Sequence, residues 1–198
     1  MYRRSGRDAD RRRTDAGTDA ATDAATDAAS DGGTESGGDA RRIVASTRAS
    51  DGTYEDRTGP VLVATLQEWG YAVPPQIVVP DGPEVGHAIG AALASSPAVV
   101  ITTGGTGVAP GDVTPEQTRP FLEREIPGIP ELVRHVGISR GLALASITRG
   151  LAGISGRTLV VNLPGSRGGV ADALSVLRPV VDHVVDQLRG GGDHDQAG

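Results

Sequence analysis

The sequence predicts an α/β fold, a three-layer sandwich in which a mostly parallel β-sheet is flanked by helices. Short runs of β-branched residues alternate along the chain with segments whose apolar residues recur at helical spacing. This alternation is typical of parallel sheets with right-handed crossovers. A glycine-rich loop follows one predicted strand and leads into the start of a helix. Polar residues follow the other strands, at the sheet edge where open α/β folds bind ligands.

The composition of the 198-residue chain excludes several kinds of chemistry. It contains no cysteine, which removes disulfides, thiolate metal sites and cysteine nucleophiles. All 19 basic residues are arginine, which removes a phosphate-binding lysine and Schiff-base catalysis. The net charge of −6 argues against nucleic acid as a partner. No apolar run reaches the length of about 18 residues that a membrane span needs, and the first residues lack a signal peptide, so we expect a cytoplasmic protein with no membrane partner.

Length and composition predict one folded domain with a polar segment on each side. A period-four repeat of Thr-Asp-Ala-Ala runs from Thr18 to Ala29, and glycine and serine follow it. Because such a segment has no apolar face to bury, we expect a disordered tail over residues 1–40. The folded domain is expected over residues 41–189, and a second disordered tail over residues 190–198.

The first half of the domain predicts two strand–helix pairs. Residues 43–47 are β-branched or small and predict a first strand. Residues 61–69 carry apolar side chains at helical spacing and end before a glycine, which predicts a helix. By the same rules, residues 77–79 predict a second strand and residues 83–95 a second helix.

A strand, a glycine loop and a helix start then follow in direct succession. Residues 99–103 predict a strand, and the loop Gly104–Gly107 comes directly after it. Thr114 is expected to cap the next helix, with Pro115 at its first position and Gln117 completing a capping box. The backbone of this loop can approach a ligand, and N–H groups beside a helix N-terminus favour an anion such as phosphate. A tight turn between strand and helix is the alternative interpretation.

Proline and glycine divide the second half of the domain. Pro120 predicts an irregularity in the helix that starts near residue 115. The β-rich runs 151–154 and 158–161 flank a short segment that contains Gly156, which predicts a hairpin. Further helical segments are expected over residues 129–136, 141–148 and 170–188.

Two aspartates follow predicted strands. Asp81 comes after strand 77–79, and Asp112 lies just beyond the glycine loop. An acid in an anion site indicates a divalent cation between it and the phosphate, or a proton to be transferred. Because the carboxyl ends of parallel strands share one edge, both carboxylates are placed to bind one metal ion. The structural alternatives are an Asp–Gly turn at Asp81 and an interaction of Asp112 with the helix dipole.

Five motifs occur in order between Arg42 and Arg189. They are Ser46-Thr47-Arg48 with Tyr54, Asp56 and Gly59; Val79-Pro80-Asp81; Thr102–Gly107 with Asp112–Glu116; Gly128–Arg134; and Asn162–Ser166. Each motif is weak alone, but together they are specific. With them the chain resembles the molybdopterin adenylyltransferase family of molybdenum cofactor biosynthesis and its sister branch. Thr47 departs from the pattern, because many relatives carry aspartate there.

The resemblance implies an enzyme that uses Mg²⁺ and ATP to transfer AMP to the terminal phosphate of molybdopterin, releasing pyrophosphate. It implies that Asp81 and Asp112 are the catalytic and metal-binding residues. It also implies a homotrimer, or a hexamer, and a molybdate-insertion protein as a partner. The implied substrate-binding residues are Ser46, Arg48, Asp56, Thr103, Gly104, Gly105, Thr106, Gly107, Asn162, Pro164, Gly165 and Ser166.

A non-catalytic molybdopterin-binding or assembly protein of the same fold is the alternative function, because the sister branch shares most of these motifs. Retention of both Asp81 and Asp112 favours the enzyme. A dinucleotide-dependent oxidoreductase is disfavoured, because the glycine loop follows the third predicted strand and not the first.

Overall fold

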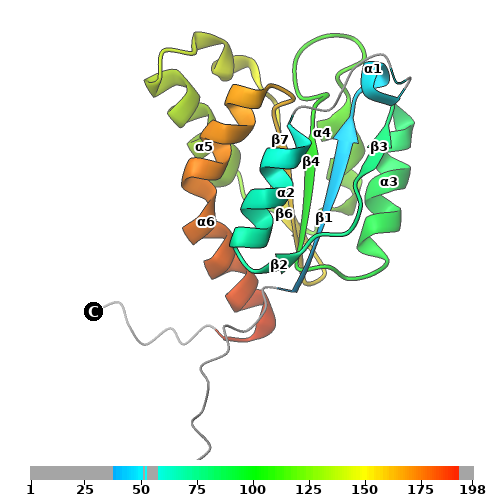
Figure 1. Ribbon diagram of the computed structural model, residues 1–198, viewed down its shortest axis with the longest axis vertical. Helices are drawn as coiled ribbons and strands as arrows, with labels where there is room; N and C mark the ends of the chain where they lie inside the picture. The colour runs from blue at the N-terminus through cyan, green and yellow to red at the C-terminus, as the bar shows by residue number, and fades with distance from the viewer. Residues whose placement is uncertain (1–37, 51, 53–57, 192–198) are drawn as a thin grey trace, which may run out of the picture. The chain divides into compact units, whose positions relative to one another are not determined.

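A mixed β-sheet with helices on both faces organises the chain (Figure 1). The computed structural model describes residues 38–50, 52 and 58–191. The strands are β1 (Gly38–Ala45), β2 (Tyr71–Ala72), β3 (Ile77–Val79), β4 (Val99–Thr103), β5 (Arg124–Glu125), β6 (Ala152–Ser155) and β7 (Thr158–Leu163). The helices are α1 (Thr47–Ser50), α2 (Gly59–Glu68), α3 (Pro83–Leu93), α4 (Thr114–Thr118), η1 (Arg119–Phe121), α5 (Gly128–Ser139), η2 (Ala143–Ile147) and α6 (Arg167–Arg189).

The sheet is parallel over most of its width. Its strand order is β2–β1–β4–β7–β6–β5, and β3 also pairs with β1. The β1, β2, β3, β4 and β7 pairings are parallel, whereas β6 and β5 run antiparallel to their neighbours. The register sets Ala45 opposite Val79, and Thr103 opposite Leu163. Four parallel strands therefore end level with one another at one edge of the sheet, as the predicted fold class requires.

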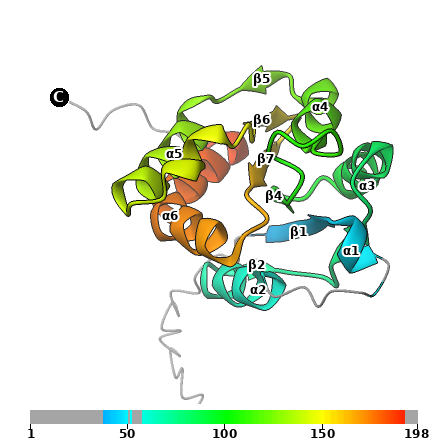
Figure 2. The ribbon, with the colours of Figure 1, turned by 90° about the horizontal axis from the view of Figure 1, so that it is seen from above.

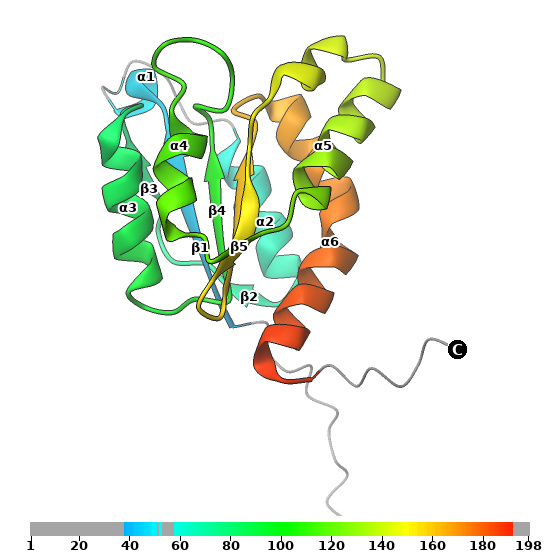
Figure 3. The ribbon, with the colours of Figure 1, turned by 180° about the vertical axis from the view of Figure 1, so that it is seen from behind.

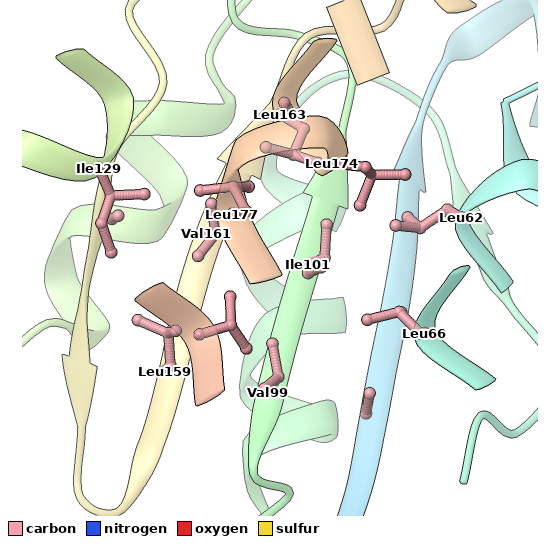
Figure 4. Close-up of a cluster of buried hydrophobic side chains, with 14 of the residues drawn as sticks. Leu62, Leu66, Val99, Ile101, Ile129, Leu159, Val161, Leu163, Leu174 and Leu177 are labelled. Atoms are coloured by element: carbon pink, nitrogen blue, oxygen red, sulfur yellow. The ribbon is translucent and has the colours of Figure 1, made fainter. Parts of the chain in front are cut away.

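Helices lie on both faces of the sheet (Figure 2). Each face has its own hydrophobic core. Side chains of α2, α5 and α6 pack on one face, where Leu62, Ile101 and Leu177 are buried (Figure 4). Helix α3 covers the other face, where Ile89 packs in a cluster with Val100 of the sheet. Burying each such side chain contributes about 1.5–3 kcal/mol. The two cores thus hold the strand ends in fixed positions relative to one another.

Several local predictions are confirmed. Strand β4 has the predicted bounds, and β6 and β7 form the predicted antiparallel hairpin, with Gly156 in the turn at φ 57°. The irregularity expected at Pro120 is present, because α4 ends at Thr118 and the 3₁₀ helix η1 follows it.

No helix in the described part of the chain is long and apolar enough to cross a membrane.

The first strand is longer at its start than predicted. β1 begins at Gly38, five residues before the predicted strand, and ends at Ala45, because α1 starts at Thr47. The charged residues at positions 39, 41 and 42 concealed this start. The backbone of Gly38 nevertheless pairs with Tyr71 in β2, and Ala40 is fully buried. Strands β2 and β5 were not predicted, since two residues carry no periodic signal.

The predicted capping box at Thr114 is wrong. Thr114 is the first residue of α4 and its side chain makes no capping hydrogen bond. Its hydroxyl is buried and has no hydrogen-bond partner, while its main-chain N–H donates to the carbonyl of Gly105 at 3.0 Å. The tertiary contact with the glycine loop therefore replaces the local cap.

Candidate functional site

Loops from four parallel strands meet at the level edge of the sheet and enclose a cavity of about 660 Å³. Residues 46 and 47 follow β1, Asp81 follows β3, Gly104 follows β4 and Gly165 follows β7. Figure 3 shows the loop after β4 rising above the strand ends on this side of the sheet. The cavity is lined by Val44, Ala45, Ser46, Thr47, Ala49, Thr58, Asp81, Thr103, Gly104, Gly105, Asp112, Gly165, Ser166 and Arg167.

The start of the glycine loop requires glycine for two reasons. Gly104 and Gly105 have φ angles of 94° and 60°, which side chains rarely adopt. A Cβ at Gly104 would overlap the carbonyl oxygen of Ala45. A Cβ at Gly105 would overlap the Thr114 hydroxyl and lie 3.2 Å from Oδ1 of Asp81. The absence of side chains here thus serves packing between protein segments as well as access for a ligand.

Asp81 is held by Thr47, which starts α1. The main-chain N–H and the hydroxyl of Thr47 donate to Oδ2 of Asp81 at 3.0 and 3.1 Å. The N–H of Asp81 is 3.2 Å from the same hydroxyl. Oδ2 is thereby occupied, and Oδ1 lies beside Gly105 at the cavity. Thr47 therefore orients one of the two predicted acids.

Asp112 is held by its own loop. Its Oδ2 accepts a hydrogen bond from the N–H of Ala109 at 2.9 Å, and its N–H donates to the Ala109 carbonyl at 2.9 Å. The carboxylate lies against Gly107, where a Cβ would come 2.7 Å from Oδ2. Asp112 also lines the cavity, so the structure brings both predicted acids to the same site.

Two carboxylates at the cavity fit a magnesium ion whose other ligands come from water or from a bound phosphate. Within the described residues no group of three or more acidic, histidine or cysteine side chains could hold a metal ion on its own. Mg²⁺, however, commonly binds proteins through one or two carboxylates and takes its other ligands from water and phosphate. Thr103 lines the cavity, and its hydroxyl is buried without a hydrogen-bond partner.

The charge pattern around the cavity also favours an anion. The N-terminus of α6 opens at the cavity, where Ser166 caps it by accepting from the N–H of Gly169 at 3.1 Å. Thr58, the N-cap residue of α2, lines the same cavity. Neither helix has an acidic residue in its first turn, so no carboxylate of the helix itself offsets the positive end of its dipole. Arg167 adds a positive side chain.

Most of the sequence-predicted residues lie at this cavity, but six do not belong to the described lining. The structure places Asp81, Asp112, Ser46, Thr103, Gly104, Gly105, Gly165 and Ser166 around it. Asp56 lies outside the described residues, and so does the side chain of Arg48. Pro164 lines a smaller cavity of about 270 Å³ between α5 and α6.

Thr106 and Gly107 face the chain that precedes β6. The Thr106 hydroxyl accepts from that of Thr148 at 3.0 Å, and its carbonyl accepts from the N–H of Arg149 at 2.8 Å. The Gly107 carbonyl accepts from Nε of Arg149 at 2.7 Å. The second half of the glycine loop is therefore bonded to protein, and only its first half borders the cavity.

Asn162 is a structural residue and not part of the cavity lining. It is buried within β7, where its amide donates to the hydroxyls of Thr102 and Thr118 at 2.9 and 3.0 Å. Its Oδ1 accepts from the N–H of Leu151 at 3.1 Å. These bonds join two neighbouring strands to α4. The sequence could not distinguish this cross-link from a ligand contact, since both need a polar side chain near a strand end.

Thr58 and Arg149 were not predicted as site residues from the sequence. The signal for Thr58 was present, because a threonine before Gly59-Pro60 is a typical helix start. Arg149 had no local signal, because its loop contacts lie more than 30 residues away in the sequence.

The chain is similar to known proteins over most of its length. The family model described as "Probable molybdopterin binding domain" matches residues 41–183, which is most of the chain. The chain belongs to this molybdenum cofactor biosynthesis family. The molybdopterin adenylyltransferase of Helicobacter pylori strain J99 is 32% identical over 152 residues, covering 74% of this chain and 85% of that protein.

One further relative is longer than this chain, and a solved structure has a similar fold. The molybdenum cofactor biosynthesis bifunctional protein of Chlorobaculum tepidum is 34% identical over 151 residues, and these cover 76% of this chain. The chain spans about half of that relative, 48% of its length. The solved structure of the molybdopterin biosynthesis Mog protein from Mycobacterium ulcerans is 43% identical, with a TM-score of 0.72, and the match covers 76% of this chain and 98% of that one. The predicted fold class is thereby confirmed.

Proposed function

We propose that this protein adenylylates molybdopterin. In the proposed reaction an oxygen of the terminal phosphate of molybdopterin attacks the α-phosphorus of ATP. The new P–O bond joins AMP to molybdopterin, and the bond to the β-phosphate breaks, so that pyrophosphate leaves with its electron pair. We propose that the adenylylated product then passes to a molybdate-insertion protein.

The observation that carries this proposal is the meeting of two carboxylates with phosphate-binding elements in one cavity. The α6 N-terminus at Ser166 and the side chain of Arg167 are placed to bind a phosphate. Asp81 and Asp112 would repel the same phosphates unless a cation lay between them. A group transfer between two phosphate-bearing substrates accounts for both features, because it relies on positioning and charge neutralisation more than on a covalent nucleophile.

Asp81 and Asp112, which both line the cavity, would hold the Mg²⁺ ion through their carboxylates. A bound Mg²⁺ supplies positive charge that offsets the negative charge developing on the phosphate oxygens during transfer. Thr47 orients the Asp81 carboxylate. Gly104 allows the loop to pack against Ala45 at the end of β1, and Gly105 leaves room for the Asp81 carboxylate.

The test is to incubate the full chain with molybdopterin, ATP and Mg²⁺ and to measure pyrophosphate together with adenylylated molybdopterin. We expect both products in equal amounts, and neither without Mg²⁺. Binding of molybdopterin without release of pyrophosphate would replace the proposal with a non-catalytic binding or assembly role. Failure to bind molybdopterin would reject both.

We also propose a homotrimer in solution. A cluster of exposed apolar side chains supports association between copies: Ile138, Leu142, Leu144 and Ile147 are each at least 47% exposed within ten residues of sequence. Analytical ultracentrifugation should give three times the chain mass of 20.2 kDa. A hexamer would double that value, and a monomer would contradict the proposal.

A further inference from the structure

Arg149 contacts both ends of the loop that follows β4. Its main-chain N–H and its Nε donate to the carbonyls of Thr106 and Gly107 at 2.8 and 2.7 Å. Its Nη2 donates to the main-chain carbonyl of Asp112 at the far end of the loop. Its Nη1 pairs with the carboxylate of Glu116 in α4. One side chain therefore joins the two stems of the loop to each other and to the next helix.

Packing contributes little to the stability of the loop between these stems. Val108, at its tip, is 68% exposed. Two hydrogen bonds between Ala109 and Asp112 shape the tip, but they link residues of the loop only to one another. The position of the loop relative to the sheet therefore depends on its stems, where Arg149 binds. Any movement of the Asp112 main chain would carry its carboxylate away from the cavity.

An arginine suits this task better than other side chains. Its planar guanidinium presents several N–H groups in a rigid fork, so it can bind two carbonyls and a carboxylate at once. A lysine has a single flexible ammonium group and cannot reproduce this geometry. The hydrogen bond from Arg149 also lowers the pKa of the Glu116 carboxyl, which keeps the ion pair formed near neutral pH.

We propose that Arg149 is a positioning residue, which keeps the Asp112 carboxylate at the cavity by tying together the stems of the loop between Gly107 and Asp112. Its effect on turnover rests on the proposed adenylylation. Its effect on the order of the loop does not, so the two can be tested separately.

The first readout is hydrogen exchange at the amides of Ala109, Asp112 and Thr114, which are hydrogen-bonded within or beside the loop. Arg149→Gln should accelerate their exchange by about tenfold or more, and leave the amides of α6 unchanged. Arg149→Lys should give a smaller acceleration. The control is Arg178→Gln, which removes an exposed arginine that pairs with Asp182 on α6 and should change none of these amides.

The second readout is steady-state adenylylation. Arg149→Gln should lower kcat by about 10- to 100-fold, the range usual for loss of a residue that orients a metal-binding group. KM for molybdopterin should stay within about threefold, because the α6 terminus at Ser166 is untouched. The Mg²⁺ concentration that gives half the maximal rate should rise, since Asp112 is displaced.

Glu116→Gln separates positioning from charge. This variant loses the ion pair but keeps the bonds from Arg149 to main-chain carbonyls, so exchange and kcat should stay within about threefold of the parent. Effects as large as those of Arg149→Gln would overturn the inference, as would unchanged loop exchange in Arg149→Gln, even if kcat fell. A parent protein without turnover would reject the proposed function, while loop exchange would still decide the role of Arg149.

Discussion

The two aspartates of the cavity differ in what holds them. Asp81 follows β3 and is bonded to Thr47, which follows β1, and these two strands are paired up to their last residues. Asp112 lies nine residues beyond the end of β4 and is bonded to Ala109 of its own loop. Sheet register therefore positions the first carboxylate, whereas the second depends on a loop fastened by Arg149. The two carboxylates at one cavity are therefore held in different ways, one by the sheet and one by a loop.

The largest expected effect comes from removing either negative charge. Asp81→Asn and Asp112→Asn keep the shape of the side chain but weaken its hold on Mg²⁺, so adenylylation should fall at least about 100-fold, or about 2.7 kcal/mol in the activation free energy. The melting temperature should change little. Molybdopterin affinity should hold or improve, since its phosphate loses a repulsive neighbour.

Asp182→Asn, on an exposed face of α6, is the matched control and should retain full turnover. If either cavity variant keeps turnover within a few-fold of the parent, that aspartate only stabilises its own turn. The difference in how the two carboxylates are held would then have no consequence for turnover.

The glycine beside each aspartate provides the next test. Gly105→Ala forces a side chain into a φ of 60° and against the buried Thr114 hydroxyl, so it should lower the free energy of unfolding by about 1–3 kcal/mol. Gly107→Ala meets only the carboxylate of Asp112 and should cost less than about 1 kcal/mol, while lowering turnover more than tenfold. Urea unfolding and pyrophosphate release measure the two effects. Equal losses of stability would show that the two stretches of the loop are equally constrained.

A smaller effect is expected at Thr47. Thr47→Val removes the hydroxyl that donates to Asp81 but keeps the main-chain N–H bond, so turnover should fall about three- to tenfold. Thr47→Ser restores the hydroxyl and should recover most of the rate. Turnover is measured in both variants as a function of Mg²⁺ concentration, which also gives the apparent Mg²⁺ affinity. A serine variant as slow as the valine variant would assign the loss to packing and not to the orientation of Asp81.

The smallest effect concerns Glu116 and pH. The hydrogen bond from Arg149 lowers the pKa of Glu116 in the folded protein, so this pair stabilises the fold above the unfolded-state pKa and loses its contribution as pH falls through the folded-state value. Because Glu116 is about half exposed, the contribution should be below about 1 kcal/mol and weaker in 1 M salt.

Thermal unfolding of the parent and of Glu116→Gln should therefore differ at pH 7 and converge toward pH 3. A difference that widened on acidification would contradict the assigned direction of the pKa change. Such a result would also weaken the view that Arg149 pairs with an ionised Glu116.

Backbone preference and periodicity were enough to predict much of the fold. Strand β4 was predicted over its full length because five consecutive residues suit a fully buried parallel strand. The β6–β7 hairpin and the break after Thr118 follow from a glycine turn and a proline. The same rules missed the start of β1, where pairing with β2 and burial of Ala40 outweigh a charged local sequence.

Some features of the candidate site were likewise predicted from the sequence, and others depend on tertiary contacts. The sequence by itself determined that Asp81, Asp112 and the first glycines of the loop would share one edge, because the carboxyl ends of parallel strands must meet there. Only the tertiary structure decided that Asn162 braces the sheet and that Thr114 leaves its cap unmade. It alone decided that Arg149 fastens the loop. Their partners lie in other elements, and a hydrogen bond depends on the position and direction of both groups, which no local pattern of residues contains.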